Sequence, residues 1–327
     1  MREAPSPQAV PVVVAAQGAA SGIWQRLSTQ RVRRAINGYL FISPWLVGFL
    51  IFQFFPILAS IYFSFTDYTM VRFPPNWVGF DNYVRLFTAD PDIPIALRVT
   101  AVYSFITVPL HLAISMSLAM LLNTNIKGVS GWRTLYYLPS LIGGVAVSML
   151  WLWIFTPHQG ILDRILRVFG ISSPGWLGSR TWALPSLIIM SLWGAGGNII
   201  LYLAGLQSIP TELYEAGKID GTTRLSEFWR ITIPLMTPVL FFTLVMGVIG
   251  SFQVFTQAYI MTDGGPAKTT MFYVLLLYRH SFQWFQMGYG AAMSWLLFVI
   301  ILILTLLVFK SSPAWVHYSA MREQRKV

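Results

Sequence analysis

Side chains capable of acid–base, nucleophilic or metal-binding chemistry are few and widely separated in this chain. The four histidines are His111, His158, His280 and His317, cysteine is absent, and no uncharged stretch pairs a histidine with an acidic residue. Hydrolytic or metal-assisted catalysis needs a nucleophile with its base, or three to four ligands, gathered at one place. The sequence therefore predicts no catalytic residue and no metal site.

Uncharged polar side chains offer hydrogen bonding instead. Ser251, Gln253 and Gln257 are interleaved with Phe252 and Phe255, so that amides and a hydroxyl alternate with aromatic rings. On a continuous helix Gln253 and Gln257 share one face, because they are four residues apart. Such side chains bind a polar solute, or they bond neighbouring helices within a membrane at about 0.6 kcal/mol each. The pattern alone leaves both interpretations open.

The elements that must position these residues are six stretches without Asp, Glu, Lys or Arg. They are 28 to 32 residues long and cover 35–66, 99–126, 134–162, 181–211, 231–262 and 280–309. A bilayer crossing needs about 20 apolar helical residues, whereas barrel strands are about 10 residues of alternating character. We therefore predict an all-α integral membrane fold with six transmembrane helices. The six-helix domain is 35–312, between a partly disordered N-terminal tail, 1–34, and a C-terminal tail, 313–327.

The distribution of basic residues predicts the orientation. With an internal N-terminus the cytoplasmic segments hold 14 Lys and Arg residues and the external segments hold 8. Cytoplasmic loops of membrane proteins carry this excess, so both termini are expected in the cytoplasm of a multi-pass inner (cytoplasmic) membrane protein. The net charge of +10 is then a topology signal. The partner of the basic residues is the lipid bilayer, and no nucleic-acid partner is expected for this protein.

No charged residue lies in the middle of a predicted span. Ion-coupled carriers keep an ionisable residue there, because something must titrate or bind the ion. The energy for any transport is therefore expected to come from elsewhere. The chain also lacks a G-x-x-x-x-G-K-[ST] phosphate loop, so it is not expected to bind ATP itself. An ion-coupled secondary transporter or a channel stays open as an alternative at this point.

Between the fourth and fifth stretches the sequence predicts two short helices that meet at a glycine turn. Pro210 suits a first helical turn, and Gly221 suits a left-handed residue that ends the helix. Thr222 or Thr223 is a suitable N-cap for the second helix, which Pro234 is expected to close. Such a rigid surface element either transmits the movement of a docked partner or is an interfacial loop without one.

The residues of this loop carry a resemblance to a known family. Glu215-Ala216-Gly217, then Asp220-Gly221, then Ile233-Pro234 resemble the Glu-Ala-Ala (EAA) loop of binding-protein-dependent ABC import permeases. Gly217 stands where that family prefers Ala, and Ile233 where it prefers Leu. The likeness extends over residues 38 to about 312. It is greatest to the first of two paired permeases in carbohydrate uptake systems of the maltose and glycerol-3-phosphate types.

The resemblance implies a subunit of an ATP-driven importer of sugars, of di- or oligosaccharide size, with glycerol phosphate-type substrates as the alternative. The segment 212–234 would couple this chain to an ATPase, and no cofactor would bind here, since ATP and Mg²⁺ belong to that partner. The implied partners are a second homologous permease, two ATPase subunits and an extracytoplasmic sugar-binding protein. The positions that match the coupling motif are Glu215, Ala216, Gly217, Asp220 and Gly221.

The resemblance also places the substrate path on the fifth span, because the matching stretch of maltose-type permeases carries the residues that contact sugar. The implied positions are Ser251, Phe252, Gln253, Phe255 and Gln257. Asn198 is a further candidate, since it follows Gly194-Ala-Gly-Gly197, a predicted weak point of the fourth span. The path contains no Lys or Arg, which favours a neutral sugar. His111, beside Pro109, is interpreted as a packing contact between helices.

Overall fold

The computed structural model describes residues 34, 36–71, 73–124 and 127–317. Helices form almost all the regular structure of these residues, and an isolated antiparallel β-bridge joins Thr66 to Trp77. Five helices are long and apolar enough to cross a membrane, and a bent helix pair makes a sixth if it forms one span. The predicted all-α membrane fold is confirmed. The predicted tails lie almost wholly outside the described residues.

The first span belongs to a unit of its own, because contacts divide the chain after Tyr62. It covers Ile36–Ser64 and contains a π-helical segment, η1 (Leu50–Phe54), followed by α2 (Phe55–Ser64). Large apolar side chains along it are exposed, among them Phe41 and Phe52. A helix that is apolar all round needs lipid or another protein to cover it.

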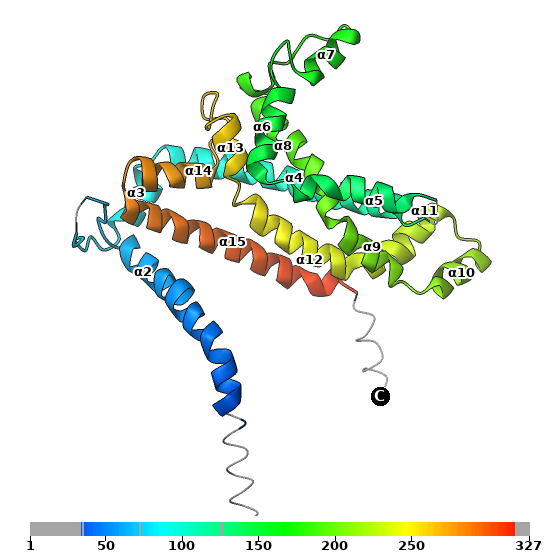
Figure 1. The fold of residues 1–327 in the computed structure, drawn as a ribbon, viewed down its shortest axis with the longest axis horizontal. Helices are drawn as coiled ribbons and strands as arrows, with labels where there is room; N and C mark the ends of the chain where they lie inside the picture. The colour runs from blue at the N-terminus through cyan, green and yellow to red at the C-terminus, as the bar shows by residue number, and fades with distance from the viewer. Residues whose placement is uncertain (1–33, 35, 72, 125–126, 318–327) are drawn as a thin grey trace, which may run out of the picture. The chain divides into compact units, whose positions relative to one another are not determined.

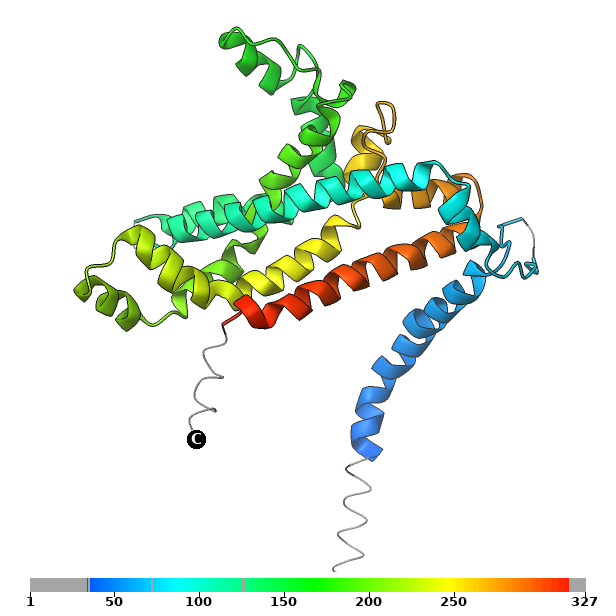
Figure 2. The same ribbon diagram turned by 180° about the vertical axis from the view of Figure 1, so that it is seen from behind.

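The second unit is organised around one long helix, α4 (Asp92–Leu122), which Figures 1 and 2 show running the length of this unit beside α12 and α15. The helices that contact α4 include α8 (Ala183–Leu192), α9 (Ile199–Gln207), α12 (Ile233–Ser251) and α14 (Tyr273–Tyr278). Next to α12 lies α15 (Met287–Trp315). One buried apolar cluster joins the first half of α4 to α14 and α15. A second joins the last turns of α4 to α9 and the start of α12.

The third predicted span is not a single straight helix. It consists of α5 (Val129–Tyr137) with a 3₁₀ turn, η2 (Leu138–Leu141), and then α6 (Gly144–Ile154), at an angle of 99°. Ile142 and Gly143 have extended backbone at the bend. Hydropathy predicted the apolar stretch over 134–162 but not this bend, because it measures apolar length and carries no information about helix direction.

The fourth span is interrupted at the predicted weak point. The glycine-rich run forms a 3₁₀ segment, η4 (Trp193–Asn198), between α8 and α9, and it packs against η2. The hydroxyl of Ser115 on α4 donates to the carbonyl of Ala195 at 2.7 Å. Gly196 lies so close to the Tyr136 carbonyl oxygen that a Cβ would come within 1.9 Å of it. The breaks in spans three and four therefore meet at one point, against α4.

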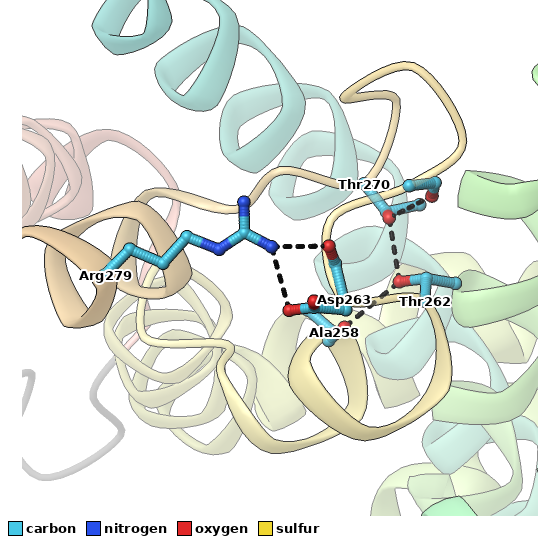
Figure 3. A network of polar contacts seen from close by, with 6 residues as sticks. Ala258, Thr262, Asp263, Thr270 and Arg279 are labelled. Atoms are coloured by element: carbon cyan, nitrogen blue, oxygen red, sulfur yellow. Dashed lines mark hydrogen bonds and ion pairs between the residues drawn. The ribbon is translucent and has the colours of Figure 1, made fainter. Parts of the chain in front are cut away.

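The connection between spans five and six is a turn held by polar contacts (Figure 3). It follows α13 (Thr256–Met261) and contains Asp263 and Gly264, both with positive φ. Arg279 donates to the carbonyl and the carboxylate of Asp263, at 2.8 and 2.9 Å. The Thr270 hydroxyl lies 2.8 Å from the Thr262 hydroxyl, and that of Thr262 donates to the Ala258 carbonyl at 3.1 Å. Asp263-Gly-Gly-Pro266 thus forms the turn that its composition predicts.

The segment between α6 and α8, residues 155–182, is called the arm. It contains α7 (Ile161–Val168) and a single 3₁₀ turn, η3 (Trp176–Gly178), and Figure 1 shows α7 at its far end. Asp163, which is buried, accepts hydrogen bonds from the His158 main-chain N–H (2.7 Å), the Ser173 hydroxyl (2.8 Å) and Trp176 Nε1 (2.6 Å). Burial raises the pKa of Asp163, but these bonds and nearby His158 lower it by more, so the carboxylate stays ionised.

Replacing Asp163 with Asn is expected to loosen the arm. The two oxygens receive three donors, and an Asn side chain turns an NH₂ group toward at least one of them, so about 2 kcal/mol or more of local stability is lost. Because the pKa of Asp163 is lowered, the carboxylate contributes its full stabilisation of the fold at any pH above the ordinary pKa of about 4. This stabilisation is lost only as the pH falls through the lowered pKa. Hydrogen exchange in the arm should therefore rise in the variant, and the protection that the carboxylate gives the wild type should stay constant between about pH 5 and 8.

Ser173→Ala provides a graded control for this prediction, since it removes one donor and keeps the carboxylate charge. Its exchange rates should fall between those of the wild type and of Asp163→Asn. Equal exchange in all three proteins would show that the carboxylate does not hold the arm.

Candidate functional site

The loop between α9 and α12 folds into two short helices that meet at a glycine turn. The first is α10 (Thr211–Ile219), directly after Pro210. Gly221 has φ +74°, its N–H donates to the Lys218 carbonyl at 3.1 Å, and the Thr222 N–H donates to the Gly217 carbonyl at 2.9 Å. This pair of bonds is a Schellman cap, which satisfies carbonyls that the last helical turn leaves without partners. The predicted stop at Gly221 is confirmed.

The second helix, α11 (Arg224–Glu227), has Thr223 as its N-cap, with the side chain accepting from the Ser226 N–H at 3.3 Å. The expectation that Pro234 closes this helix was wrong. A π-helical segment, η5 (Phe228–Thr232), leads directly into α12, so one helix runs over Arg224–Ser251. Pro234 lies in the first turn of α12. A proline is tolerated there because the wider π-turn changes the hydrogen-bonding register that its ring would otherwise disturb.

Internal contacts hold this loop against α12. The Tyr214 hydroxyl lies 3.0 Å from the Thr232 hydroxyl, so α10 is tied to η5. A Cβ at Gly217 would come within 2.9 Å of Thr222 Oγ1 and 3.3 Å of Ile231 Cδ1. Close packing in the turn therefore explains why this chain has glycine where the EAA pattern has alanine.

The side of the loop that faces away from α12 makes no internal contacts of this kind. Glu215, Ala216 and Asp220 are exposed, and the Glu215 side chain has neither a hydrogen bond nor an ion pair within the described part of the chain. Large apolar side chains are exposed around them; these are Leu213, Ile219, Leu225 and Trp229. An exposed apolar patch beside an unpaired carboxylate, on a rigidly capped helix, is typical of a surface that binds another protein.

Two of the predicted path residues share a cavity. A cavity of about 350 Å³ lies between α4, the α8–η4 break and α12, and both Asn198 and Ser251 line it. The same cavity is lined by further polar side chains that the sequence analysis did not select; these are Tyr103, Thr107, His111, Ser191 and Thr243. Three of them could have been found from the sequence, because residues 103, 107 and 111 are spaced four positions apart and so form one polar stripe on a helix.

The other predicted path residues do not gather as expected. The helix breaks after Ser251, and α13 begins only at Thr256, so Gln253 and Gln257 do not share a helix face. Gln253 lines a second, mostly apolar cavity of about 570 Å³ beside α15. The Tyr103 hydroxyl, in contrast, lies near the side chains of Gln257 and Ser191. The prediction that Gln253 and Gln257 share a face was wrong. Four-residue spacing places two side chains on one face only if the helix is continuous, and tertiary packing interrupts the helix here.

The two phenylalanines of this stretch are packed in the protein interior. Phe252 is buried in the larger apolar cluster. Phe255 stacks on Tyr259 with ring centroids 5.3 Å apart and contacts Tyr278 at 5.0 Å. Both rings help to hold the α12–α13 break in place.

Comparisons with known proteins agree with this architecture. Residues 111–316 match the family model described as "binding-protein-dependent transport system inner membrane component". The probable ABC transporter permease protein YesP of Bacillus subtilis (strain 168) is 43% identical, with 88% of this chain and 94% of that protein covered. The trehalose/maltose transport system permease protein MalF of Thermococcus litoralis is 33% identical, covering 86% of this chain and 96% of that protein.

A solved structure shares the fold as well. A chain of a bacterial alginate ABC transporter, crystallised with an alginate pentasaccharide-bound periplasmic protein, superposes with a TM-score of 0.77. It is 25% identical, and the match covers 86% of this chain and 96% of that chain. The resemblance to binding-protein-dependent import permeases is thus confirmed over most of the chain. This protein belongs to the family of binding-protein-dependent transport system inner membrane components, as a multi-pass transport permease rather than an enzyme.

Proposed function

We propose that this chain is one permease subunit of an ATP-driven sugar importer. The observation that carries the proposal is the match over more than four-fifths of the chain to permeases whose names and complexes specify saccharides. The capped helix α10, with its exposed and unpaired Glu215, supports the ATP-driven part, since it offers a docking element to a separate motor protein.

The coupling segment is 212–234, in which Glu215, Ala216, Asp220 and Gly221 form the exposed surface and Gly217, which is buried, allows the close packing beneath it. Glu215 forms charge-assisted hydrogen bonds with an ATPase subunit, and Gly221 supplies the turn that presents it. ATP and Mg²⁺ bind to the ATPase, and this chain holds no cofactor. Because η5 joins the loop to α12 without a break, movement of the docked helix passes directly into the fifth span.

The full assembly contains this chain, a second homologous permease, two ATPase subunits and an external sugar-binding protein. The distribution of Lys and Arg, 14 against 8, supports a cytoplasmic position for α10 and α11 and for both termini. The binding protein favours one conformation of the permease pair and ATP closure favours the other, so sugar passes by alternating access.

The substrate path includes Asn198, Ser251 and Gln257, which lie in or beside the cavity next to α4, together with Gln253 at the neighbouring cavity. Amide and hydroxyl groups among apolar walls suit the hydroxyls and the apolar ring faces of a sugar.

Replacing Gln253 and Gln257 together with Ala is expected to lower sugar uptake by about tenfold while the assembly still forms, because two hydrogen-bonding amides are lost. The measurement is ATP-dependent uptake into proteoliposomes that contain the co-purified complex and a saturated binding protein. Gln283→Ala is the matched control, since Gln283 is exposed and lines neither cavity.

The single variants separate the two positions that the structure has placed apart. Loss of uptake in Gln257→Ala alone would place the path beside Tyr103. Accumulation of solute by the isolated chain from an ion gradient, or purification without an ATPase, would contradict the proposed function.

A further inference from the structure

The cavity beside α4 contains a polar group that the proposed path does not use. Tyr103, Thr107 and His111 line it from one face of α4, whereas Ser191 and Asn198 line it from the α8–η4 break. The third wall comes from Thr243 and Ser251 on α12. All of these elements belong to one chain, so these polar groups of the cavity come from this subunit alone.

Two polar atoms in this cavity are buried without a partner. Within the described residues, neither Thr107 Oγ1 nor His111 Nε2 has a hydrogen bond. The imidazole of His111 lies beside the main-chain carbonyl of Ser191. The nitrogen that faces this carbonyl must carry the proton, because a carbonyl only accepts. In the neutral ring Nε2 is then left as a hydrogen-bond acceptor.

The surroundings of His111 favour this neutral form. The residues that line the cavity include no Asp, Glu, Lys or Arg, and the other titratable side chain among them is Tyr103. No carboxylate therefore faces the ring to stabilise an imidazolium, from α4, from the α8–η4 break or from α12. An acceptor nitrogen without a donor partner, His111 Nε2, in a cavity without charged side chains suits a neutral ligand that donates a hydrogen bond from a hydroxyl group.

We propose that His111 is a specificity-determining residue of this importer, and that its Nε2 accepts a hydrogen bond from a hydroxyl of a neutral sugar bound inside this single subunit. The proposal rests on the proposed function and names a subsite for it. Thr107 completes the subsite, because it lies four residues before His111 on the same face of α4 and lines the same cavity. A packing role for His111, as the sequence suggests, accounts for the side of the ring that faces Ser191 and leaves Nε2 unexplained.

The test compares ATP-dependent uptake of radiolabelled maltose, trehalose and lactose by the intact complex in proteoliposomes. His111→Phe fills similar space without an acceptor and is expected to lower uptake at least tenfold, through KM. His111→Gln keeps an acceptor and is expected to stay within threefold of the wild type. Ser104→Ala is the matched control, since Ser104 is a buried, unpartnered neighbour on α4 that does not line the cavity.

Monodeoxy analogues of the transported sugar separate recognition from packing. The analogue that lacks the donating hydroxyl should be taken up poorly by the wild type and no worse by His111→Phe. Uptake by His111→Phe equal to the wild type, or an equal loss for every analogue, would overturn the inference while leaving the sugar importer intact. Absence of ATP-driven uptake for all three sugars in the wild type would count against the proposed function and this inference together.

Discussion

Replacing Glu215 with Ala, or Gly221 with Val, is expected to leave the protein folded in the membrane but to uncouple it from ATP hydrolysis. Glu215 is exposed and unpaired in the described chain, so its removal costs the isolated subunit nothing and removes a charge-assisted bond to the partner. Such bonds contribute about 1.5–3 kcal/mol, which corresponds to a tenfold to hundredfold weaker contact. Sugar uptake should fall by at least tenfold.

Gly221 acts through backbone conformation. Its φ of +74° costs a residue with a side chain about 1–2 kcal/mol, and a β-branched residue more. The space around it is open, since no atom lies within 4 Å of the position that a Cβ would take there. Gly221→Asn is therefore a sharp control, because Asn tolerates the left-handed region and should retain coupling where Val loses it.

The measurement for both positions is binding-protein-stimulated ATP hydrolysis and sugar uptake in the reconstituted complex, with subunit stoichiometry checked after purification. Glu215→Ala and Gly221→Val should both show impaired uptake and lose stimulation. Wild-type stimulation and uptake in both variants would show that α10 is not the coupling element. An equal loss of stimulated ATP hydrolysis and uptake in Gly221→Asn and Gly221→Val would show that any added side chain, rather than the left-handed backbone conformation of the turn, causes the loss.

Replacing Gly196 with Ala is expected to destabilise the protein strongly although it adds a single methyl group. The new Cβ would come within 1.9 Å of the Tyr136 carbonyl oxygen and 2.8 Å of its carbon, and both atoms belong to the backbone. Neither helix has a rotamer change available that relieves the overlap. The packing of η2 on η4 must open, at a cost of about 3 kcal/mol or more.

Two neighbouring glycines provide a graded control within the same 3₁₀ segment. A Cβ at Gly194 would meet nothing within 4 Å, whereas one at Gly197 would lie 3.1 Å from Ser140 Cβ. Thermal stability of the purified protein should therefore fall in the order Gly194→Ala, Gly197→Ala, Gly196→Ala, with the first close to the wild type. A Gly196→Ala protein as stable as Gly194→Ala would contradict the close contact between spans three and four.

The parts of this protein that the sequence predicted are those set by local rules. Apolar length defined the spans, since a bilayer imposes the same requirement on any helix, and five of the six were found as helical runs long and apolar enough to cross a membrane. The cap at Gly221 and an N-cap at Thr222 or Thr223, which the structure places at Thr223, were predicted because each depends on the conformational preference of one residue. The break at Gly194–Gly197 was predicted because consecutive glycines weaken a helix.

The wrong predictions share one cause, which is that neighbouring helices changed the local path of the chain. Gln253 and Gln257 keep the spacing of a helix face, yet α12 ends between Ser251 and Phe252, where buried rings pack. Pro234 is a helix breaker in isolation, yet the π-turn before it lets the helix continue. Distant contacts outweighed residue preference at both places.

The sequence by itself determined that this chain is a helical membrane protein with a glycine-capped helical loop between its fourth and fifth spans, because apolar length, charge placement and turn residues act within one segment. Only the tertiary structure decided where the spans bend and which polar side chains face a common cavity. Tyr103, Thr107 and His111 precede Asn198 and Ser251 by many residues, and only the packing of α4 against the α8–η4 break and α12 brings them together. A hydrogen-bonding site depends on such juxtaposition, and no single segment contains it.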